Sequence, residues 1–196
     1  LVNMLLLHFN DNSHAVLVTG HHIVCDGWSL SLMIKDLSTI YSSLVKNEQP
    51  DLESAVSFIT YANEQEHYLK SKEHEEVEKF WLDQYQGELP VVEFPPDNHR
   101  PTVRSFFAKR IDVTVPPELV NRLRQLSRKS NTSFVTIMLS SFESYLYRIT
   151  GQEDLVVGLP AAGQNVEGYY NLIGHCVNLL PLRSKIRPEQ AFSDYL

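Results

Sequence analysis

The sequence predicts an α/β protein made of one two-layer lobe and part of a second, similar lobe. Apolar, strand-like runs alternate along the chain with segments whose apolar residues recur at helical spacing. A proline-rich stretch near the middle has little periodicity, which is typical of an extended connection. We therefore expect residues 1–90 to be the second part of an N-terminal lobe, residues 91–103 a crossover between lobes, and residues 104–196 the first part of a C-terminal lobe.

The composition is that of an ordinary globular protein, with 196 residues, 43% of them hydrophobic and 21% charged. The formal charge of -7 argues against a nucleic-acid surface. No apolar run reaches membrane-spanning length and no signal peptide is present, so we expect no membrane association. The two cysteines, Cys25 and Cys176, are too few for a disulfide framework, which favours a reducing cytoplasm. The chain begins inside an apolar run and stops just after Phe192 opens a helical pattern, so we expect a fragment incomplete at both ends.

The first elements are predicted to be two strands and a helix. Residues 2–9 and 14–20 are strand-like and are joined by the turn-forming residues 10–13. We expect the second strand to be buried. The helix runs from about Ser29 to Lys46, with an apolar stripe predicted to lie in the core.

Residues 57–86 have helical periodicity and are predicted to form two helices or one helix broken near Ser71. His67 and His74 lie on the polar side of this region, and nothing near them in sequence completes a metal site. The alternation over residues 104–115 predicts a strand.

Two helices and two strands are expected in the C-terminal part. Pro117 suits the first turn of a helix, and residues 131–133 offer an N-cap for the next helix. That second helix, residues 134–149, is so rich in apolar side chains that it is predicted to be buried on most sides, with Gly151 as its stop. A buried strand is predicted at residues 154–160 and a further strand at residues 173–183, with a polar loop between them.

The run His21-His22-Ile23-Val24-Cys25-Asp26-Gly27-Trp28-Ser29 lies where the second strand meets the first helix. A connection of this kind can hold polar side chains at the mouth of a cleft. His22 can take a proton near neutral pH and return it. Asp26 can fold back to fix loop geometry or meet a cation. Gly27 permits a backbone conformation closed to other residues and lets a substrate come near.

Trp28 and Ser29 open the helix, where free amides favour developing negative charge. No serine or cysteine stands in a G-x-S-x-G context, so a covalent acyl-enzyme is not indicated. A histidine base without a partner nucleophile predicts direct transfer between two bound substrates.

The histidine run resembles the H-H-x-x-x-D-G motif of the condensation domains of nonribosomal peptide synthetases, which belong to the chloramphenicol acetyltransferase-like group. Residues 96–101 resemble the Asp-x-x-Arg-Pro crossover of that family, and residues 173–183 resemble its Ile-Gly-x-Phe-Val-Asn-x-x-x-x-Arg segment. Residues 58–62 match an aromatic-x-x-Tyr-Ala segment loosely. Cys176 departs from the pattern, because the family commonly has phenylalanine there.

The resemblance implies a two-lobed chloramphenicol acetyltransferase-like fold, with mixed sheets flanked by helices. It also implies an acyltransferase-type enzyme that joins an acyl or peptidyl thioester on a donor carrier protein to the amine of an aminoacyl thioester on an acceptor carrier protein. The substrates would arrive on 4'-phosphopantetheine arms, no cofactor or metal would be bound by the domain itself, and an adenylation domain would be a neighbour in the same megasynthase. The isolated fragment is expected to be inactive.

The resemblance implies that His22 is the reacting group, either as a general base or by positioning the amine. The backbone amide of Gly27 or the start of the helix would stabilise the oxyanion. Asp26 is expected to be mainly structural and to pair with an arginine, either Arg183 or an arginine in the preceding part of a longer chain. His21 is expected to pack and hydrogen-bond beneath the loop.

Supporting residues are expected around the substrate channel, namely His21, Trp28, Ser29, Asn178 and Arg183. Asn178 is expected to tie strand to loop and could contact substrate. His175 is expected to act as a packing or hydrogen-bonding residue rather than a second base.

Two alternatives stay open at this point. An epimerisation domain shares the doubled histidine, but its glycine is usually followed by Val-Ser-Trp, and the order Gly27-Trp28-Ser29 favours condensation. A non-catalytic carrier-protein docking scaffold of the same family is the other, and the intact histidines, aspartate and glycine argue against it. Cyclisation domains, which replace the histidines with aspartate, are disfavoured.

Overall fold

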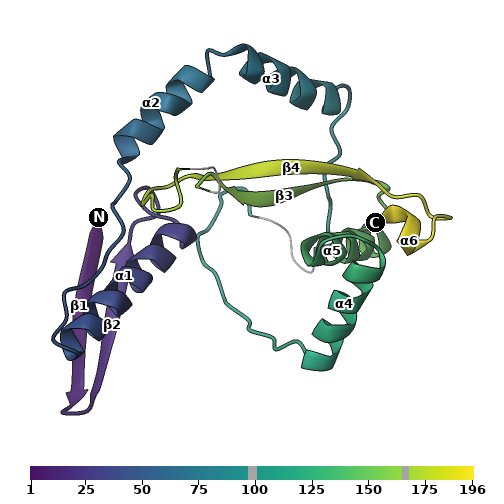
Figure 1. Ribbon diagram of the computed structural model, residues 1–196. Helices are drawn as coiled ribbons and strands as arrows, with labels where there is room; N and C mark the ends of the chain where they lie inside the picture. The colour runs from purple at the N-terminus through teal and green to yellow at the C-terminus, as the bar shows by residue number, and fades with distance from the viewer. Residues whose placement is uncertain (97–100, 165–167) are drawn as a thin grey trace. The chain divides into compact units, whose positions relative to one another are not determined.

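The structure is a computed structural model that describes residues 1–96, 101–164 and 168–196. Its elements in chain order are β1 (Val2–Asn10), β2 (Ser13–Gly20), α1 (Gly27–Val45), α2 (Phe58–Tyr68), α3 (Lys72–Gln84), α4 (Pro117–Lys129), α5 (Phe134–Thr150), β3 (Asp154–Ala162), β4 (Val177–Lys185) and α6 (Phe192–Tyr195) (Figure 1). The α/β class predicted from the sequence is confirmed.

The chain divides into two compact units. The first contains residues 1–83 and 159–180, and the second contains residues 84–158 and 181–196. The predicted lobe boundary at residues 91–103 concerns a complete two-lobed domain and stays a prediction. Most of its proline-arginine signature, at residues 97–100, lies outside the described residues.

β1 and β2 form an antiparallel hairpin in the first unit, with Val2 opposite Gly20. The side chain of Asn10 accepts a hydrogen bond from the backbone N–H of Asn12 at 3.0 Å and so stabilises the turn. The hairpin leads directly to the two histidines, as predicted. The prediction that β2 is buried is wrong, because its residues are exposed or half-buried. Within the described residues, no third strand extends this sheet.

α1 begins at Gly27, two residues earlier than predicted, because Asp26 is its N-cap. One carboxylate oxygen of Asp26 accepts a hydrogen bond from the backbone N–H of Ser29 at 2.9 Å. The apolar stripe of the helix is only half-buried at Leu30 and Leu37. Helix α1 is therefore fixed at its N-terminus by Asp26, while most of its residues are exposed or half-buried.

The helical region after α1 is two helices, α2 and α3, separated at Ser71 as predicted. The core of the first unit lies beside α2, where Tyr61 packs edge-on against Tyr169 with ring centroids 5.1 Å apart. Leu172 and Cys176 complete this buried cluster. The core thus joins α2 to the segment that follows β3 in the chain.

In the second unit, the predicted helix signals are confirmed. Pro117 lies in the first turn of α4, and Ser133 caps α5 by accepting a hydrogen bond from the N–H of Thr136 at 3.0 Å. Gly151 ends α5 in the left-handed conformation with φ of 71°, and its N–H donates to the carbonyl of Tyr147 at 2.8 Å.

The prediction that α5 is buried on most sides is wrong. Only one face is buried, and it includes the carboxylate of Glu143 as well as Ile137 and Leu146. Leu146 packs with Leu155 and Ile186 to form the core of the second unit. The rest of α5 exposes large apolar side chains: Val135, Met138, Phe142 and Tyr145.

β3 and β4 form a two-stranded sheet. β3 confirms a strand at residues 154–160 and is two residues longer, but its predicted burial is wrong, because Leu155 alone among its residues is buried. The strand predicted at residues 173–183 is wrong in its first part, because β4 begins at Val177. The backbone of residues 174–176 instead makes hydrogen bonds to side chains at the start of α1. These bonds occupy the N–H groups of Gly174 and Cys176, which are therefore not free to pair with a strand.

The strand predicted at residues 104–115 is also wrong, since this segment contains no helix or strand. A strand needs a neighbour for its backbone hydrogen bonds. No such pairing is found for this segment in the described parts of the chain. Its apolar side chains are correspondingly open, with Phe106 88% and Ile111 87% exposed.

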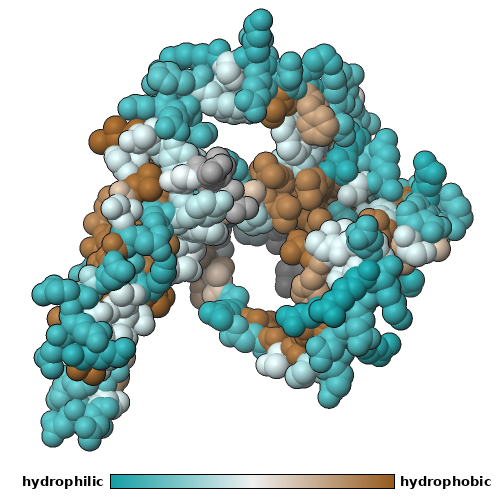
Figure 2. Space-filling view, viewed as in Figure 1, coloured by the Kyte–Doolittle hydropathy of each residue, from teal (hydrophilic) through white to brown (hydrophobic). Residues whose placement is uncertain are grey.

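Hydrophobic residues appear on the molecular surface among hydrophilic ones in Figure 2. None of the helices in the described ranges is long and apolar enough to cross a membrane. Those ranges also contain no group of three or more His, Cys, Asp or Glu residues arranged to hold a metal ion.

Candidate active site

His22 lies in the short connection between β2 and α1, and its side chain is exposed. Its Nδ1 is 3.1 Å from Nδ1 of His175, and the two rings meet edge-on with centroids 4.9 Å apart. Among the described residues, Nε2 of His22 has no hydrogen-bond partner. The imidazole is therefore held through one nitrogen while the other nitrogen is open to a substrate.

Asp26 lies beneath this connection and is 1% exposed. One of its oxygens accepts from both the backbone N–H and the hydroxyl of Ser29, at 2.9 and 2.8 Å. The other accepts from the side-chain amide of Gln164 at 2.8 Å and from the backbone N–H of Cys176 at 3.1 Å. The carboxylate is thus surrounded by neutral donors that come from three separate segments of the first unit.

These contacts determine the acidity of Asp26. Burial alone raises the pKa of a carboxyl group, because it removes the charged form from water. The hydrogen bonds from Gln164, from the backbone of Ser29 and Cys176, and from the Ser29 hydroxyl outweigh burial and lower the pKa of Asp26 to about 2. Asp26 is therefore a buried anion at neutral pH, unsuited to accept a proton from a substrate.

Ser29 is the second anchor, and it is fully buried. Its hydroxyl oxygen accepts from the backbone N–H of Gly174 at 3.0 Å, and its proton can reach the carbonyl of Gly174 at 2.9 Å or the carboxylate of Asp26. Because Ser29 bonds Gly174 and Asp26 bonds Cys176, the residue between them, His175, is held on both sides. Folding thus brings a segment distant in the sequence to the start of α1.

Gly27 and Trp28 border an open hollow of about 420 Å³ at the start of α1, which Ser31, Leu32 and Lys35 also line. The indole N–H of Trp28 donates to the carbonyl of Tyr170 at 2.9 Å. The special backbone conformation that glycine permits is not used at Gly27, since its φ is not positive. A Cβ at this position would meet nothing within 4 Å. What Gly27 provides here is open space.

The side chain of His21 bonds a neighbour within the segment that joins β2 to α1, and it does not lie beneath that segment. Its Nδ1 accepts from the backbone N–H of Ile23 at 3.1 Å, and its backbone N–H donates to the carbonyl of Leu1 at 2.8 Å. The hydrogen-bonding role expected for His21 is confirmed. The expectation that the side chain packs beneath the loop is wrong, because it is exposed.

Arg183 does not pair with Asp26. It belongs to the second unit, where its guanidinium bonds both oxygens of Asp154, at 2.9 and 2.6 Å. The hydrogen bond between them lowers the pKa of Asp154 and raises the pKa of Arg183. The pairing of Asp26 with Arg183 is therefore wrong, and the physical reason is that each already has another partner.

The expectation that Asn178 ties strand to loop stays a prediction, because residues 165–167 of that loop lie outside the described residues. Asn178 lies in β4 with an exposed side chain, for which the described residues provide no hydrogen bond. His175, in contrast, is the hydrogen-bonding residue that the sequence suggested, and its partner is His22. The structure thus brings the motif residues His22, Asp26, Gly27, Trp28 and Ser29 together with His175.

Sequence reasoning missed Gln164, which is fully buried and donates to Asp26. Nothing in its neighbourhood marks it, since it follows Gly163 at the start of a polar loop. Cys176 departs from the family pattern in its side chain, but its role here is carried by its backbone N–H. Burial raises the pKa of the Cys176 thiol, with a smaller contribution from the negative charge of Asp26.

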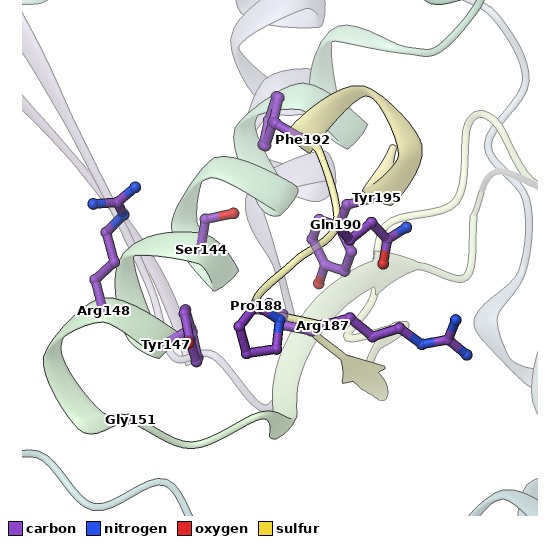
Figure 3. Close-up of a pocket in the computed structure, with 10 residues that line it drawn as sticks. Ser144, Tyr147, Arg148, Gly151, Arg187, Pro188, Gln190, Phe192 and Tyr195 are labelled. Atoms are coloured by element: carbon purple, nitrogen blue, oxygen red, sulfur yellow. The ribbon is translucent and has the colours of Figure 1, made fainter.

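A second hollow, of about 480 Å³, lies wholly within the second unit (Figure 3). Ser144, Tyr147 and Arg148 of α5 line one part, and C-terminal residues that include Arg187 and Tyr195 line another. Burial, together with the hydrogen bond to Glu143, raises the pKa of Tyr195 to about 12. None of the residues predicted from the sequence to form a site lines this hollow.

A sequence model of the condensation-domain family matches residues 1–196, and the chain therefore belongs to the condensation domains of the nonribosomal peptide synthetases. Among curated proteins, it is 32% identical over 191 residues to surfactin synthase subunit 1 of Bacillus subtilis (strain 168). It is 30% identical over 191 residues to bacitracin synthase 1 of Bacillus licheniformis. These matches cover 97% of this chain but only 4 to 5% of the relatives.

Solved condensation domains have the same fold. The first condensation domain of the calcium-dependent antibiotic synthetase, in complex with a substrate analogue, superposes with a TM-score of 0.81 at 24% identity, covering 98% of this chain and 42% of that chain. A four-domain nonribosomal peptide synthetase bound to AMP and glycine gives 0.84 at 22% identity, covering 99% of this chain and 14% of that chain. The chloramphenicol acetyltransferase-like fold predicted from the sequence is thereby confirmed.

Proposed function

We propose that the chain contributes the reacting histidine of an enzyme that forms an amide between two carrier-bound substrates. The donor is an acyl or peptidyl thioester, and the acceptor is the amine of an aminoacyl thioester. The observation that carries the proposal is the placement of His22, whose ring is exposed and whose Nε2 has no partner within the described residues. Membership of the condensation family supports the reaction class.

In the proposed reaction, the acceptor amine attacks the thioester carbonyl, a C–N bond forms, and the C–S bond breaks. Nε2 of His22 removes the proton that the nitrogen must lose, and this proton leaves with the released thiolate. Asp26 cannot take this proton, because its pKa is about 2 and it is buried. Holding both substrates in place would supply much of the rate by proximity.

The start of α1 is suited to steady the oxyanion that forms on the thioester carbonyl. Asp26 already accepts hydrogen bonds from two backbone N–H groups of the helix. Its side chain accepts from the N–H of Ser29, and its backbone carbonyl accepts from the N–H of Leu30 at 3.0 Å. No bond to another described residue is found for the backbone N–H groups of Gly27 and Trp28, so both could bind a ligand. The open space at Gly27 would let the carbonyl oxygen approach them.

The partners follow from the same proposal. Donor and acceptor carrier domains would present their substrates on 4'-phosphopantetheine arms, and an adenylation domain would lie in the same polypeptide. The curated relatives are synthetases many times longer than this chain, which supports such neighbours. The domain itself would need no bound cofactor, and it would work in the cytoplasm, where the two buried cysteines stay as thiols.

The test is His22→Ala in the intact protein, meaning the whole polypeptide that contains these residues. We expect amide formation between loaded carriers to fall by at least about a hundredfold, the scale of general base catalysis, while the thermal midpoint is unchanged because the ring is exposed. Product amide and unreacted thioesters are measured by mass spectrometry of the carriers. His67→Ala, which removes an exposed imidazole from α2, is the matched control and should be fully active.

Full activity of the His22 variant would remove this residue from the mechanism. The alternatives give different results in the same assay. A docking scaffold would form no amide in the unmodified protein, although it would still bind loaded carriers. An epimerisation domain would exchange the α-proton of a carrier-bound aminoacyl group for solvent deuterium without joining two substrates.

A further inference from the structure

The contact between His22 and His175 is not used in the proposed reaction, and it constrains the proton on the reacting ring. A neutral imidazole carries one N–H donor and one acceptor nitrogen. Two Nδ1 atoms 3.1 Å apart can form a hydrogen bond only if one of them bears a proton and the other does not. The protonation of His22 therefore depends on that of its neighbour.

Only one of the two possible arrangements leaves His22 able to act as a base. If Nδ1 of His22 donates to Nδ1 of His175, then Nε2 of His22 carries a lone pair and faces the substrate. In the opposite arrangement Nε2 of His22 would carry the proton, and it could only donate. When Nε2 has accepted a proton, the Nδ1–H of the imidazolium still donates to His175, which stabilises the charged ring.

The backbone on both sides of His175 is anchored, which fixes the position from which its ring reaches His22. Gly174 is bonded through its N–H to the buried hydroxyl of Ser29 at 3.0 Å. Cys176 is bonded through its N–H to the buried carboxylate of Asp26 at 3.1 Å. Both anchors belong to the cap and first turn of the helix that follows His22. The two imidazoles thus share one rigid support.

We propose that His175 is a positioning residue, which accepts a hydrogen bond from Nδ1 of His22 and thereby holds the reacting ring with its proton on Nδ1. This rests on the proposed function as far as catalysis is concerned, but the location of the proton can be measured without any reaction. The ring tautomer of a histidine is set by the hydrogen bond that its other nitrogen makes. In water, a neutral imidazole side chain without such a bond favours the proton on Nε2.

The first test is spectroscopic, on the intact protein labelled with ¹⁵N-histidine at about pH 8, where an ordinary imidazole is neutral. Long-range ¹H–¹⁵N spectra distinguish protonated from unprotonated ring nitrogens, and His22→Ala assigns the resonances. We expect the proton on Nδ1 of His22 in the unchanged chain. His175→Phe keeps a ring but removes the acceptor, and should move the proton to Nε2. His175→Asn keeps an acceptor oxygen near the position of Nδ1, and should restore the original tautomer.

The matched control is His14→Phe. His8 and His14 form another histidine ring pair, with centroids 4.7 Å apart on the hairpin, so this change also removes one ring of a pair. It should leave the His22 spectrum unchanged. A proton on Nε2 of His22 in the unchanged chain, or the same tautomer in His175→Phe as in the unchanged chain, would overturn the proposal.

The second test is kinetic, in the intact protein. His175→Phe should lower kcat about ten- to a hundredfold with little change in KM, because binding surfaces are kept while the base is lost. His175→Asn should recover most of kcat. An unchanged kcat for His175→Phe would contradict the inference. This failure differs from failure of the proposed function, which would show as full activity in His22→Ala.

Discussion

Asp26 is a buried carboxylate whose charge is balanced by hydrogen bonds and not by a cation in the described part of the chain. Four neutral donors from Ser29, Gln164 and Cys176 converge on its two oxygens. Buried anions of this kind are stable only while every donor stays in place. The residue therefore joins the start of α1 to residues 164 and 176, and its role is to build the support on which the histidine contact rests.

This environment predicts a dependence of stability on pH. Because the pKa of Asp26 is lowered from 3.8 to about 2, the folded chain binds a proton less readily than the unfolded chain. The resulting stabilisation, about 2.5 kcal/mol by linkage, is present above pH 4 and is lost as the pH falls towards 2. Urea denaturation of the chain at several pH values measures it.

Asp26→Asn is the matched variant, since it keeps the shape and removes the charge. The share of the acid dependence that comes from Asp26 should disappear, while the share from Asp154, whose pKa is also lowered, should remain. The variant should also be less stable at pH 7 by about 1–3 kcal/mol, because its amide N–H₂ opposes the donors of Gln164 or Cys176. An acid profile identical to that of the unchanged chain would contradict this account of Asp26.

At the residue scale, the sequence indicated that Asp26 is structural, but Arg183, one of its two suggested partners, pairs with Asp154 instead. The motif predicts that a buried charge needs compensation, and an arginine is the obvious candidate. The actual donors include a side chain at position 164, 138 residues away, and a backbone N–H at position 176. The residues around positions 164 and 176 form no recognisable motif, so these two donors could not be predicted from the sequence.

At the scale of elements, the site depends on how closely the end of β3 and the segment before β4 approach each other. The N–H of Gly163 donates to the carbonyl of Cys176 at 2.9 Å. A Cβ on Gly163 would lie 2.6 Å from that carbonyl oxygen and 2.9 Å from the hydroxyl of Tyr61. A backbone oxygen cannot move aside as the end of a flexible side chain can. Glycine is therefore required here for close approach.

Gly163→Ala should destabilise the first unit by about 1–3 kcal/mol, the usual cost of overpacking. Gly27→Ala is the control, because a Cβ there meets nothing within 4 Å and the residue is helical. Its stability should be unchanged or slightly raised. The free energies of unfolding are compared by urea denaturation of the two variants. Equal stability of both would show that the approach at Gly163 is not tight.

The elements that the sequence predicted best are those with local signals. Capping residues such as Ser133, a stop such as Gly151 and the turn of the β1–β2 hairpin act on neighbours in the chain, so their effects are visible in the sequence. Strands depend on a distant partner. The alternation in residues 104–115 satisfies the local condition, yet no described strand pairs with it. Residues 174–176 likewise bond to a distant helix start.

At the scale of the whole molecule, this chain exposes many more large apolar side chains than a folded globular protein usually does. Leu6, Phe9 and Tyr145 are among many large apolar residues that lie open to solvent. The chain spans 42% of a solved condensation domain of the same fold. Covering these surfaces with further chain would bury them, and each large side chain so buried contributes about 1.5–3 kcal/mol.

The 196-residue chain by itself should therefore bind a hydrophobic dye such as ANS strongly and form no amide from loaded carriers. The intact protein should bind much less dye per molecule of chain and should be active. Dye fluorescence and mass spectrometry of the carriers measure the two properties. Weak dye binding by the isolated chain would show that its apolar surface is covered in some other way, for example by self-association, which light scattering would detect.

The indole of Trp28 is tethered to the carbonyl of Tyr170 and borders the hollow beside Gly27. The chain has only one other tryptophan, Trp81 in α3. Replacing Trp81 with phenylalanine would leave Trp28 as the single tryptophan of the 196 residues, next to the connection between β2 and α1. Its emission wavelength would then test, without any chemical label, whether a ligand enters the hollow that Trp28 borders.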